Sequence, residues 1–282
     1  MRSVVVTGAS TGIGRACALL LDQKGWMVFA GVRRDMDGDA LRKEASAHLR
    51  AVRLDVTDPA QVRAVGEEVA AAVGESGLDG LVNNAGTAVA APLEFVPPQA
   101  LLRQFEVNVV GQVAVTQALL PLLRKARGRI VNMGSISGLV SLPFMGPYSA
   151  SKFALEAITD ALRVELAPWG IGVAIVEPGS VATPIWDKSG EAATEMAKGY
   201  PPEAQALYGA VFERLGAAVM AEGKRGLPPA RVAAAVLHAL TAEQPRTRYL
   251  VAPGGRGRAT SLLRRLPDRL RDNLVLRKLK GR

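Results

Sequence analysis

The first turn of the chain reads Thr7-Gly8-Ala9-Ser10-Thr11-Gly12-Ile13-Gly14. A Val-rich run, Ser3–Thr7, leads into this turn, and a helical pattern follows it to about Lys24. A strand, a glycine-rich turn and a helix form a dinucleotide-binding arrangement, because glycines let the backbone approach a pyrophosphate and the helix N-terminus supplies free N–H groups. The spacing G-x-x-x-G-x-G differs from the common G-x-G-x-x-G, and an ordinary tight connection is the other interpretation.

Short β-branched runs alternate with longer helical patterns along the rest of the chain. Parallel strands need crossover connections, so this alternation predicts an α/β fold with helices on both faces of a parallel sheet. We expect a three-layer, doubly wound Rossmann fold with a small helical lid and a sheet of about seven strands: Ser3–Thr7, Met27–Val32, Ala51–Leu54, Leu78–Val82, Arg129–Met133, Gly172–Val176 and Arg248–Val251.

The domain organisation follows from where the alternation of strand and helix patterns stops. A single Rossmann-type domain is expected over residues 1–252. Trp186–Leu227 lacks strands, and a structureless loop of that length is unusual in a compact domain, so residues 186–227 are interpreted as an inserted substrate lid. Residues 253–282 form a C-terminal tail that contains ten Lys or Arg and two Asp or Glu.

Composition excludes several classes of protein. The net charge is +9, but the 252 residues before the tail carry 25 basic and 24 acidic side chains, so no extended nucleic-acid-binding surface is expected. One cysteine, Cys17, excludes an internal disulfide, and with two histidines it makes no usual zinc site, so no metal is expected. No apolar run reaches the roughly 18 residues of a membrane span, and a cytoplasmic location is expected.

Further motifs occur where strands end. Asn83-Asn84-Ala85-Gly86 ends the fourth strand, Ser135 follows the fifth, and Tyr148-Ser149-Ala150-Ser151-Lys152 opens the next helix. Tyr148 and Lys152 are four residues apart and share one helical face. Taken alone, this pair is equally well explained as a helix-start Tyr and a surface Lys.

The motifs together, in this order and spacing, resemble the short-chain dehydrogenase/reductase (SDR) family over roughly residues 3–185. The resemblance implies a catalytic acid/base at Tyr148, a ribose-holding lysine at Lys152, a substrate-orienting serine at Ser135 and a water-holding asparagine at Asn108. The usual paired serines stand here as Gly134-Ser135, and Ser137 is a less favoured alternate to Ser135.

The resemblance also implies a cofactor site. Its members are the turn residues Gly8, Ser10, Thr11, Gly12, Ile13 and Gly14; Asp55 and Val56 at the adenine; Asn84, Ala85 and Gly86 beside the nicotinamide ribose, together with Tyr148 and Lys152; and Pro178, Gly179, Val181 and Thr183 at the carboxamide.

The chemistry of these residue types agrees with the roles. Hydride transfer to a carbonyl creates an alkoxide that must be protonated, and a Tyr has an ordinary pKa near 10. A nearby ammonium and a cationic nicotinamide favour the phenolate, which brings proton exchange nearer to neutral pH. A serine hydroxyl can donate to the carbonyl oxygen and position it.

The end of the second strand predicts which nicotinamide cofactor is used. An Asp or Glu about 20 residues after the turn would hold the 2′-hydroxyl of NAD, but Val32 occupies that position. Arg33 follows and can pair with a 2′-phosphate, which favours NADP(H) over NAD(H), whereas Asp35 is expected to be too far along the loop. The other interpretation treats Arg33 and Arg34 as a solvated charge pair.

The substrate is expected to be a lipophilic ketone, aldehyde or alcohol. The stretch Leu142–Glu156 resembles carbonyl reductases and dehydrogenases of the steroid and retinoid type. Candidate apolar lining residues, for each of which core packing is the alternative, are Leu142, Phe144, Met145, Ile185, Trp186, Tyr200, Tyr208 and Met220. Three other functions are alternatives: an NAD-dependent alcohol dehydrogenase of this family, an isomerase or dehydratase on the same fold, and a non-catalytic nucleotide sensor.

Two interaction surfaces are expected. The resemblance implies a homo-oligomer, a dimer or tetramer, joined through Pro98–Lys125 and Tyr148–Ala167. The tail is basic and Leu-rich, with a helix opened by Pro267 and Asp268 and closed by Arg277 and Lys278. We interpret it as a basic amphipathic segment that either contacts a membrane surface peripherally or packs on protein; its leucines are Leu262, Leu263, Leu266, Leu270, Leu274, Leu276 and Leu279.

Overall fold

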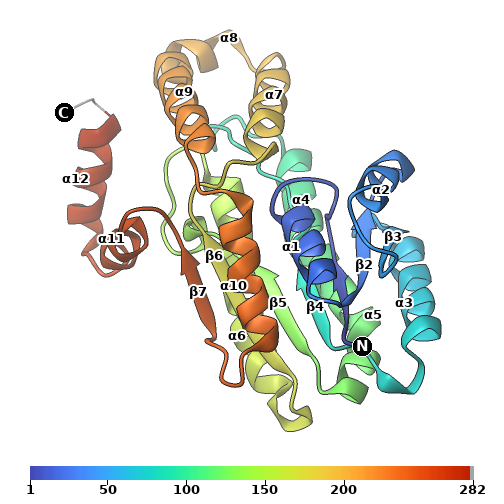
Figure 1. Ribbon diagram of the computed structural model, residues 1–282. Coiled ribbons are helices and arrows are strands. Elements are labelled where there is room, and N and C mark those ends of the chain that lie inside the picture. Colours follow the sequence, from blue (N-terminus) through green and yellow to red (C-terminus); the bar gives the residue numbers. More distant parts are fainter. Residues whose placement is uncertain (280–282) are drawn as a thin grey trace.

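A seven-stranded, all-parallel sheet forms the centre of the molecule, and the fold prediction is confirmed (Figure 1). The computed structural model describes residues 1–279, apart from the side chains of residues 256, 258, 261, 278 and 279. The strand order is β3-β2-β1-β4-β5-β6-β7. The strands are β1 (Ser3–Val6), β2 (Met27–Val32), β3 (Leu49–Arg53), β4 (Gly80–Asn83), β5 (Arg129–Met133), β6 (Gly172–Pro178) and β7 (Arg248–Val251).

Helices cover both faces of this sheet. The core against α1 and α10 is separate from the core against α3 and α5, and α6 packs on β6 on the second face. The helices are α1 (Gly12–Gln23), α2 (Asp35–Arg42), α3 (Pro59–Val73), α4 (Pro98–Phe105), α5 (Gly111–Ala126), α6 (Gly146–Glu165), α7 (Ile185–Ala197), α8 (Pro202–Ala204), α9 (Ala210–Lys224), α10 (Pro229–Thr241), α11 (Arg256–Leu263) and α12 (Asp268–Leu279).

Local sequence explains why the elements form where they do. Val4, Val5 and Val6 are fully buried because β1 is a central strand that is covered on both faces. Helix α3 begins at Pro59, and the Asp58 carboxylate caps it by accepting hydrogen bonds from the N–H groups of Ala60 and Gln61, at 2.9 and 3.2 Å. Because the sheet is all parallel, the carboxyl ends of its strands lie at one edge, and the candidate site is at this edge.

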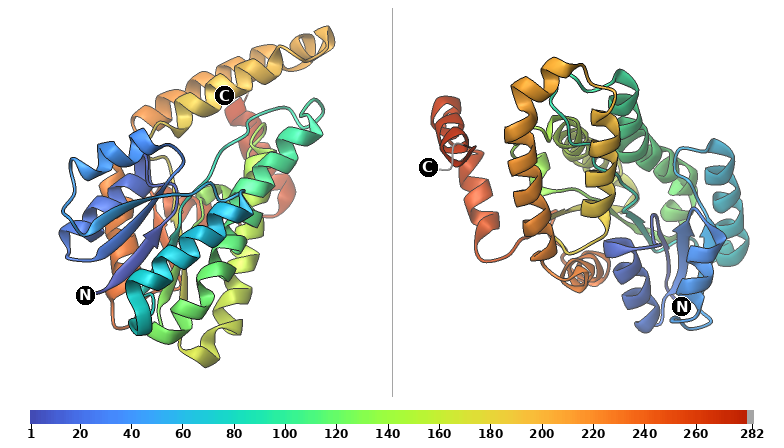
Figure 2. Two further views of the ribbon diagram at one scale, coloured as in Figure 1. Left: turned by 90° about the vertical axis from the view of Figure 1, so that its right-hand side faces the viewer. Right: turned by 90° about the horizontal axis from the view of Figure 1, so that it is seen from above.

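The segment α7–α9 lies above the carboxyl ends of the strands (Figures 1 and 2). Helices α7 and α9 pack on each other and are joined through α8 and a π-helical turn, Gln205–Gly209. The indole N–H of Trp186 donates to the main-chain oxygen of Val181 at 2.7 Å, and Ser189 Oγ donates to that of Ala88 at 2.8 Å. These bonds fasten α7 over the edge of the sheet.

The tail corrects one expectation. Helix α11 follows β7 at the sheet edge, and α12 stands beside the domain, set apart from it (Figures 1 and 2). Leu270 and Leu274 lie one turn apart on α12, but Leu276 lies on a different side of the helix, so the predicted amphipathic face is absent from its described side chains. The side chains of Lys278 and Leu279 lie outside the described ones.

One long helical stretch, Pro98–Ala126, is apolar enough to cross a membrane by length and composition alone. Half of its most apolar window is buried in the protein, as in a core helix. It combines α4, a π-helical segment (Glu106–Val110) and α5.

Candidate active site

The glycine-rich turn joins β1 to α1 with the backbone that its sequence predicts. Gly8 and Gly12 have φ of +65° and +58°, in the left-handed region that favours glycine. A Cβ on Gly14 would overlap the main-chain oxygen of Gly8, so no larger residue fits there. The side chain of Thr11 does not cap α1. The first N–H groups of this helix are therefore available to a bound anion such as a pyrophosphate.

A polar brace holds the turn against the end of β4. Thr7 Oγ1 accepts hydrogen bonds from the N–H groups of Asn84 and Ala85, each at 2.9 Å. Asn84 Nδ2 donates to the main-chain oxygens of Thr7 and Gly8, at 2.9 and 3.1 Å. The Asn84 amide thus shapes the cofactor turn itself. Thr7 was not among the predicted site residues; its position as a polar residue at the end of a buried Val run was the signal in the sequence.

Asn108 lies in the π-helical segment Glu106–Val110 between α4 and α5. Its Oδ1 accepts the N–H of Thr87 at 2.8 Å, and its Nδ2 donates to the Thr87 oxygen at 3.0 Å and to Ser151 Oγ at 3.1 Å. Ser151 Oγ in turn donates to the main-chain oxygen of Tyr148 at 2.7 Å. Asn108 therefore ties the loop after β4 to the first turn of α6; π-helical turns often occur at functional sites.

Ser135, Tyr148 and Lys152 come together at the carboxyl end of β5. The buried ammonium of Lys152 donates to the main-chain oxygen of Met133 at 2.7 Å and lies 5.7 Å from the centre of the Tyr148 ring. Tyr148 forms a side-chain hydrogen bond with Ser135, which also accepts the N–H of Ser137 at 3.1 Å. Of the two candidate serines, Ser135 has the hydroxyl that contacts Tyr148.

Burial controls the protonation of this cluster. It raises the pKa of Tyr148, and the hydrogen bond with Ser135 acts in the opposite direction. Burial also lowers the pKa of Lys152 to about 8, against a smaller effect of Glu156. In the protein without a cofactor, burial of Tyr148 outweighs the hydrogen bond with Ser135, and the pKa of the phenol lies above its ordinary value. A hydroxyl pair beside an ammonium is suited to protonate an oxyanion.

The end of β2 presents one arginine without an ion-pair partner among the described residues. Val32 is buried, and Arg33 follows it with an exposed side chain. Arg34 donates two hydrogen bonds to Asp37, at 2.9 and 2.8 Å. Asp35 pairs instead with Arg53 at 3.5 Å. Arg33 is therefore the cation at this edge that stays available to a ligand.

Asp55 follows β3 nearby. Its Oδ1 accepts hydrogen bonds from the N–H and the hydroxyl of Thr57, at 3.0 and 2.7 Å, which fixes the carboxylate within its own loop. Val56 is buried and lies close to Gly111 of α5. The loop that carries both residues is therefore held firmly at the same edge as Arg33.

The segment after β6 lies close to the glycine-rich turn. A Cβ on Gly12 would lie 3.1 Å from the side chain of Thr183. Gly179 donates its N–H to the main-chain oxygen of Val251 at 2.9 Å, and Val181 is buried and pairs with Leu227. Pro178 ends β6. The predicted carboxamide segment and the predicted pyrophosphate turn thus meet at one edge.

Aromatic rings join the α7–α9 segment to the loops over the sheet. Phe144 lies 5.3 Å from Phe212 and 6.0 Å from Tyr208, and Phe95 lies 5.9 Å from both Tyr200 and Tyr208, between ring centres. Of the predicted apolar lining residues, Phe144, Tyr200 and Tyr208 gather here. Others are placed elsewhere: Leu142 is exposed, Trp186 packs against Gly223, and Met220 lies near Gly190.

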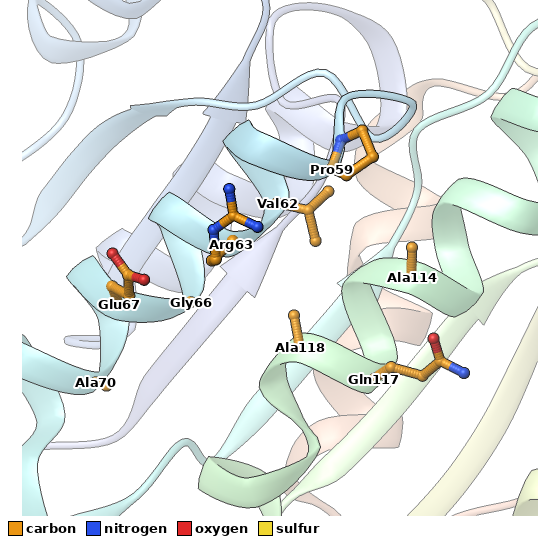
Figure 3. A pocket seen from close by; sticks show the side chains of 9 residues that line it. All are labelled: Pro59, Val62, Arg63, Gly66, Glu67, Ala70, Ala114, Gln117 and Ala118. Atoms are coloured by element: carbon orange, nitrogen blue, oxygen red, sulfur yellow. The ribbon is translucent and has the colours of Figure 1, made fainter.

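A separate groove lies between α3 and α5 on the outer face of the molecule (Figure 3). Small residues, Gly66 and Ala118, bring these helices close together, and only Arg63 and Glu67 among its lining residues are ionisable. It contains none of the predicted site residues. The groove is therefore a consequence of helix packing and is distinct from the candidate site.

Comparison with known proteins gives concordant matches. The short chain dehydrogenase family model matches residues 2–194. The chain is 39% identical to an NADPH-dependent 3-dehydrocapnine reductase of Ornithobacterium rhinotracheale over 99% of this chain and 98% of that protein. It is 41% identical to retinol dehydrogenase 5 of Mus musculus, over 89% of this chain and 80% of that protein.

A solved structure agrees with the fold and the family. A short chain dehydrogenase/reductase of Burkholderia phymatum in complex with NAD superimposes with a TM-score of 0.78 at 27% identity, covering 93% of this chain and 92% of that one. With the glycine-rich turn and the cluster of Ser135, Tyr148 and Lys152 in place, these matches make the chain a member of the short-chain dehydrogenase/reductase family of oxidoreductases.

Proposed function

We propose that this protein is an NADP(H)-dependent oxidoreductase that interconverts a lipophilic ketone or aldehyde and its alcohol. The observation that carries the proposal is the meeting of Ser135, Tyr148 and Lys152 beside the glycine-rich turn. A nucleotide sensor would need neither the acid/base nor the buried ammonium, so the complete set favours catalysis.

The cofactor fits the residues of this edge. The turn from Gly8 to Gly14, with Ser10, Thr11 and Ile13, would bind the pyrophosphate at the N-terminus of α1. Asp55 and Val56 would contact the adenine, the Asn84–Gly86 stretch and Lys152 the nicotinamide ribose, and the Pro178–Thr183 segment the carboxamide. The nicotinamide, when bound, supplies or accepts the hydride.

The protein residues handle the proton. Ser135 donates a hydrogen bond to the carbonyl oxygen and fixes its position, and Tyr148 donates the proton that converts the alkoxide to the alcohol. The reverse reaction uses the same groups with Tyr148 as the base. Lys152 opposes the effect of burial on Tyr148 with its positive charge. Both polar atoms of the Asn108 side chain already form hydrogen bonds, so a relay water would bind to its main chain.

Arg33 supports the preference for NADP(H) because it is an exposed cation directly after Val32, where NAD-binding proteins of this fold carry a carboxylate. The full-length similarity to an enzyme named as NADPH-dependent agrees with this choice. A solved relative contains NAD, so the family accommodates both cofactors, and NAD-dependent alcohol oxidation is the second candidate.

A lipophilic substrate is supported by the aromatic cluster above the site and by the similarity to a retinol dehydrogenase. Exposed apolar side chains on α5–α6 and the adjoining turns, Val110, Phe153, Val164 and Trp169, support a homo-oligomer through these helices. Exposed leucines and arginines on α12 support peripheral contact with an anionic membrane surface.

The test is a fluorescence titration of the purified protein with NADPH and, in parallel, NADH, followed by a turnover screen of apolar ketones and aldehydes. We expect tighter binding of NADPH and turnover of at least one apolar carbonyl compound. Preference for NADH would overturn the cofactor assignment and leave the enzyme class intact. Binding of neither nucleotide would contradict the whole proposal.

A further inference from the structure

A buried carboxyl pair lies behind the catalytic lysine. Glu156 is one helical turn after Lys152 on α6, so the two side chains share a face of the helix. Glu177 is on β6, and its neighbour Val176 faces the α1–α10 core, so Glu177 points to the opposite face, toward α6. The two glutamates therefore meet between α6 and the sheet.

Both carboxyl groups are almost sealed from water. Glu156 is 9% exposed and Glu177 is 2% exposed. Glu156 Oε1 and Glu177 Oε1 find no hydrogen-bond donor among the described groups. Arg248 Nη2 donates to Glu156 Oε2 at 3.1 Å, but its Nε is 3.9 Å from Glu177 Oε1, too far for a hydrogen bond.

A proton shared between the two carboxyl groups would provide the missing hydrogen-bond donor and remove the repulsion between them. Two ionised carboxylates in contact repel each other, whereas a proton held between them provides a hydrogen bond and leaves one negative charge. Burial raises the pKa of Glu177 to about 7, and the charge of Glu156 adds to this effect. Burial also raises the pKa of Glu156.

The other charges around the pair come from three elements. Lys152 and Asp160 face it from α6, Arg248 from β7, and Arg264 from the end of α11. Arg248 also donates two hydrogen bonds to Asp160, each at 2.9 Å. Arg248 therefore divides its hydrogen bonds between Asp160 and Glu156 and does not fully neutralise the negative charge of the glutamate pair. That negative charge also acts on the ammonium of Lys152.

We propose that Glu156 and Glu177 share one proton and act as a positioning pair that keeps Lys152 in its ammonium form for the reaction. The proposal rests on the proposed function. The ammonium donates its hydrogen bond to a neutral carbonyl, that of Met133, so Glu156 is the anion that stabilises its charge. Without that anion, Lys152 loses its proton at lower pH, and Tyr148 loses its cationic neighbour.

The pair can exchange protons with solvent. Glu177 lines a pocket between the sheet edge and the tail, together with Leu139, Arg248, Leu250, Arg264 and Arg265. This pocket contains none of the predicted cofactor or substrate residues, and it brings solvent next to Glu177, although Oε1 of that carboxyl group is itself covered. The charge behind Lys152 can therefore follow the pH of the solution.

The experiment measures kcat/KM against pH for the Glu156→Gln and Glu177→Gln variants, with a carbonyl substrate found in the screen. Glu156→Gln should move the alkaline limb to lower pH by about half a unit or more, since the negative charge of the pair then lies on Glu177, whereas Glu156 is the carboxylate that acts on Lys152. Glu177→Gln should leave that limb in place, because its amide donates to Glu156 and preserves the charge. Glu165→Gln, exposed on the same helix, is the matched control.

A second readout does not depend on activity. The infrared carbonyl stretch of a protonated carboxyl group should be present in the wild-type protein near neutral pH and absent from both single variants. An equal loss of kcat at every pH in Glu156→Gln, with no movement of the limb, would overturn the positioning role, and an unchanged infrared band would overturn the shared proton. Failure of the proposed function would leave the infrared result intact.

Discussion

The ammonium of Lys152 donates a hydrogen bond to the main-chain oxygen of Met133, the last residue of β5, at 2.7 Å. This bond ties the second turn of α6 to the strand whose next residues are Gly134 and Ser135. The serine hydroxyl and the ammonium are therefore positioned by the same strand end, one through the chain and one through a hydrogen bond. The relative positions of Ser135, Tyr148 and Lys152 depend on this contact between α6 and the sheet.

The first prediction concerns Tyr148. Tyr148→Phe removes the phenolic proton donor and preserves the ring, so turnover should fall by at least about 100-fold while NADPH binding is preserved. Steady-state kinetics and fluorescence titration measure the two quantities. Turnover close to that of the wild type, in a variant with unchanged thermal stability, would exclude Tyr148 as the acid/base.

The second prediction concerns Arg33. Arg33→Ala should weaken NADPH binding by about 10-fold or more and leave NADH binding nearly unchanged, because a charge-assisted contact to the 2′-phosphate is lost. Arg34→Ala is the control, since Arg34 already pairs with Asp37. Equal losses for both nucleotides would show that Arg33 does not contact the 2′-phosphate.

The third prediction concerns the tail. Leu270, Leu274 and Leu276 on α12 are about half exposed, beside Arg269 and Arg277. The full chain should pellet with vesicles that contain anionic lipid, and deletion of residues 268–282 should abolish pelleting. Neutral vesicles and added salt are the controls, because both remove the electrostatic attraction. Equal pelleting with and without these residues would remove the membrane proposal.

Local patterns predicted the sheet and helix α6, which carries Tyr148 and Lys152, because both depend on short-range periodicity. The β5 and β7 bounds match the predicted ones, and Tyr148 and Lys152 lie where their spacing placed them. The π-helical turn at Asn108 depends on hydrogen bonds to Thr87 and Ser151, far away in sequence.

Two further features also escaped sequence analysis. The Glu156–Glu177 pair forms only when α6 meets β6, so no local pattern could indicate it. The tail was interpreted from its leucine content, but a break after Leu263 and the spacing of Leu276 disperse its leucines around two helices. The leucine content of the tail does not show on which sides of the helices the leucines lie.

The last prediction follows from the raised pKa of Glu177. The folded chain keeps this carboxyl protonated up to a pKa of about 7, whereas the unfolded chain loses the proton near its ordinary value of 4.5. Between these values the native state binds more protons, so the free energy of unfolding should fall as pH rises from about 4.5 to about 7. Glu177→Gln should flatten this slope, while Glu165→Gln should preserve it. Urea denaturation at several pH values measures the slope, and parallel curves for the wild type and Glu177→Gln would mean that Glu177 is ionised throughout the range.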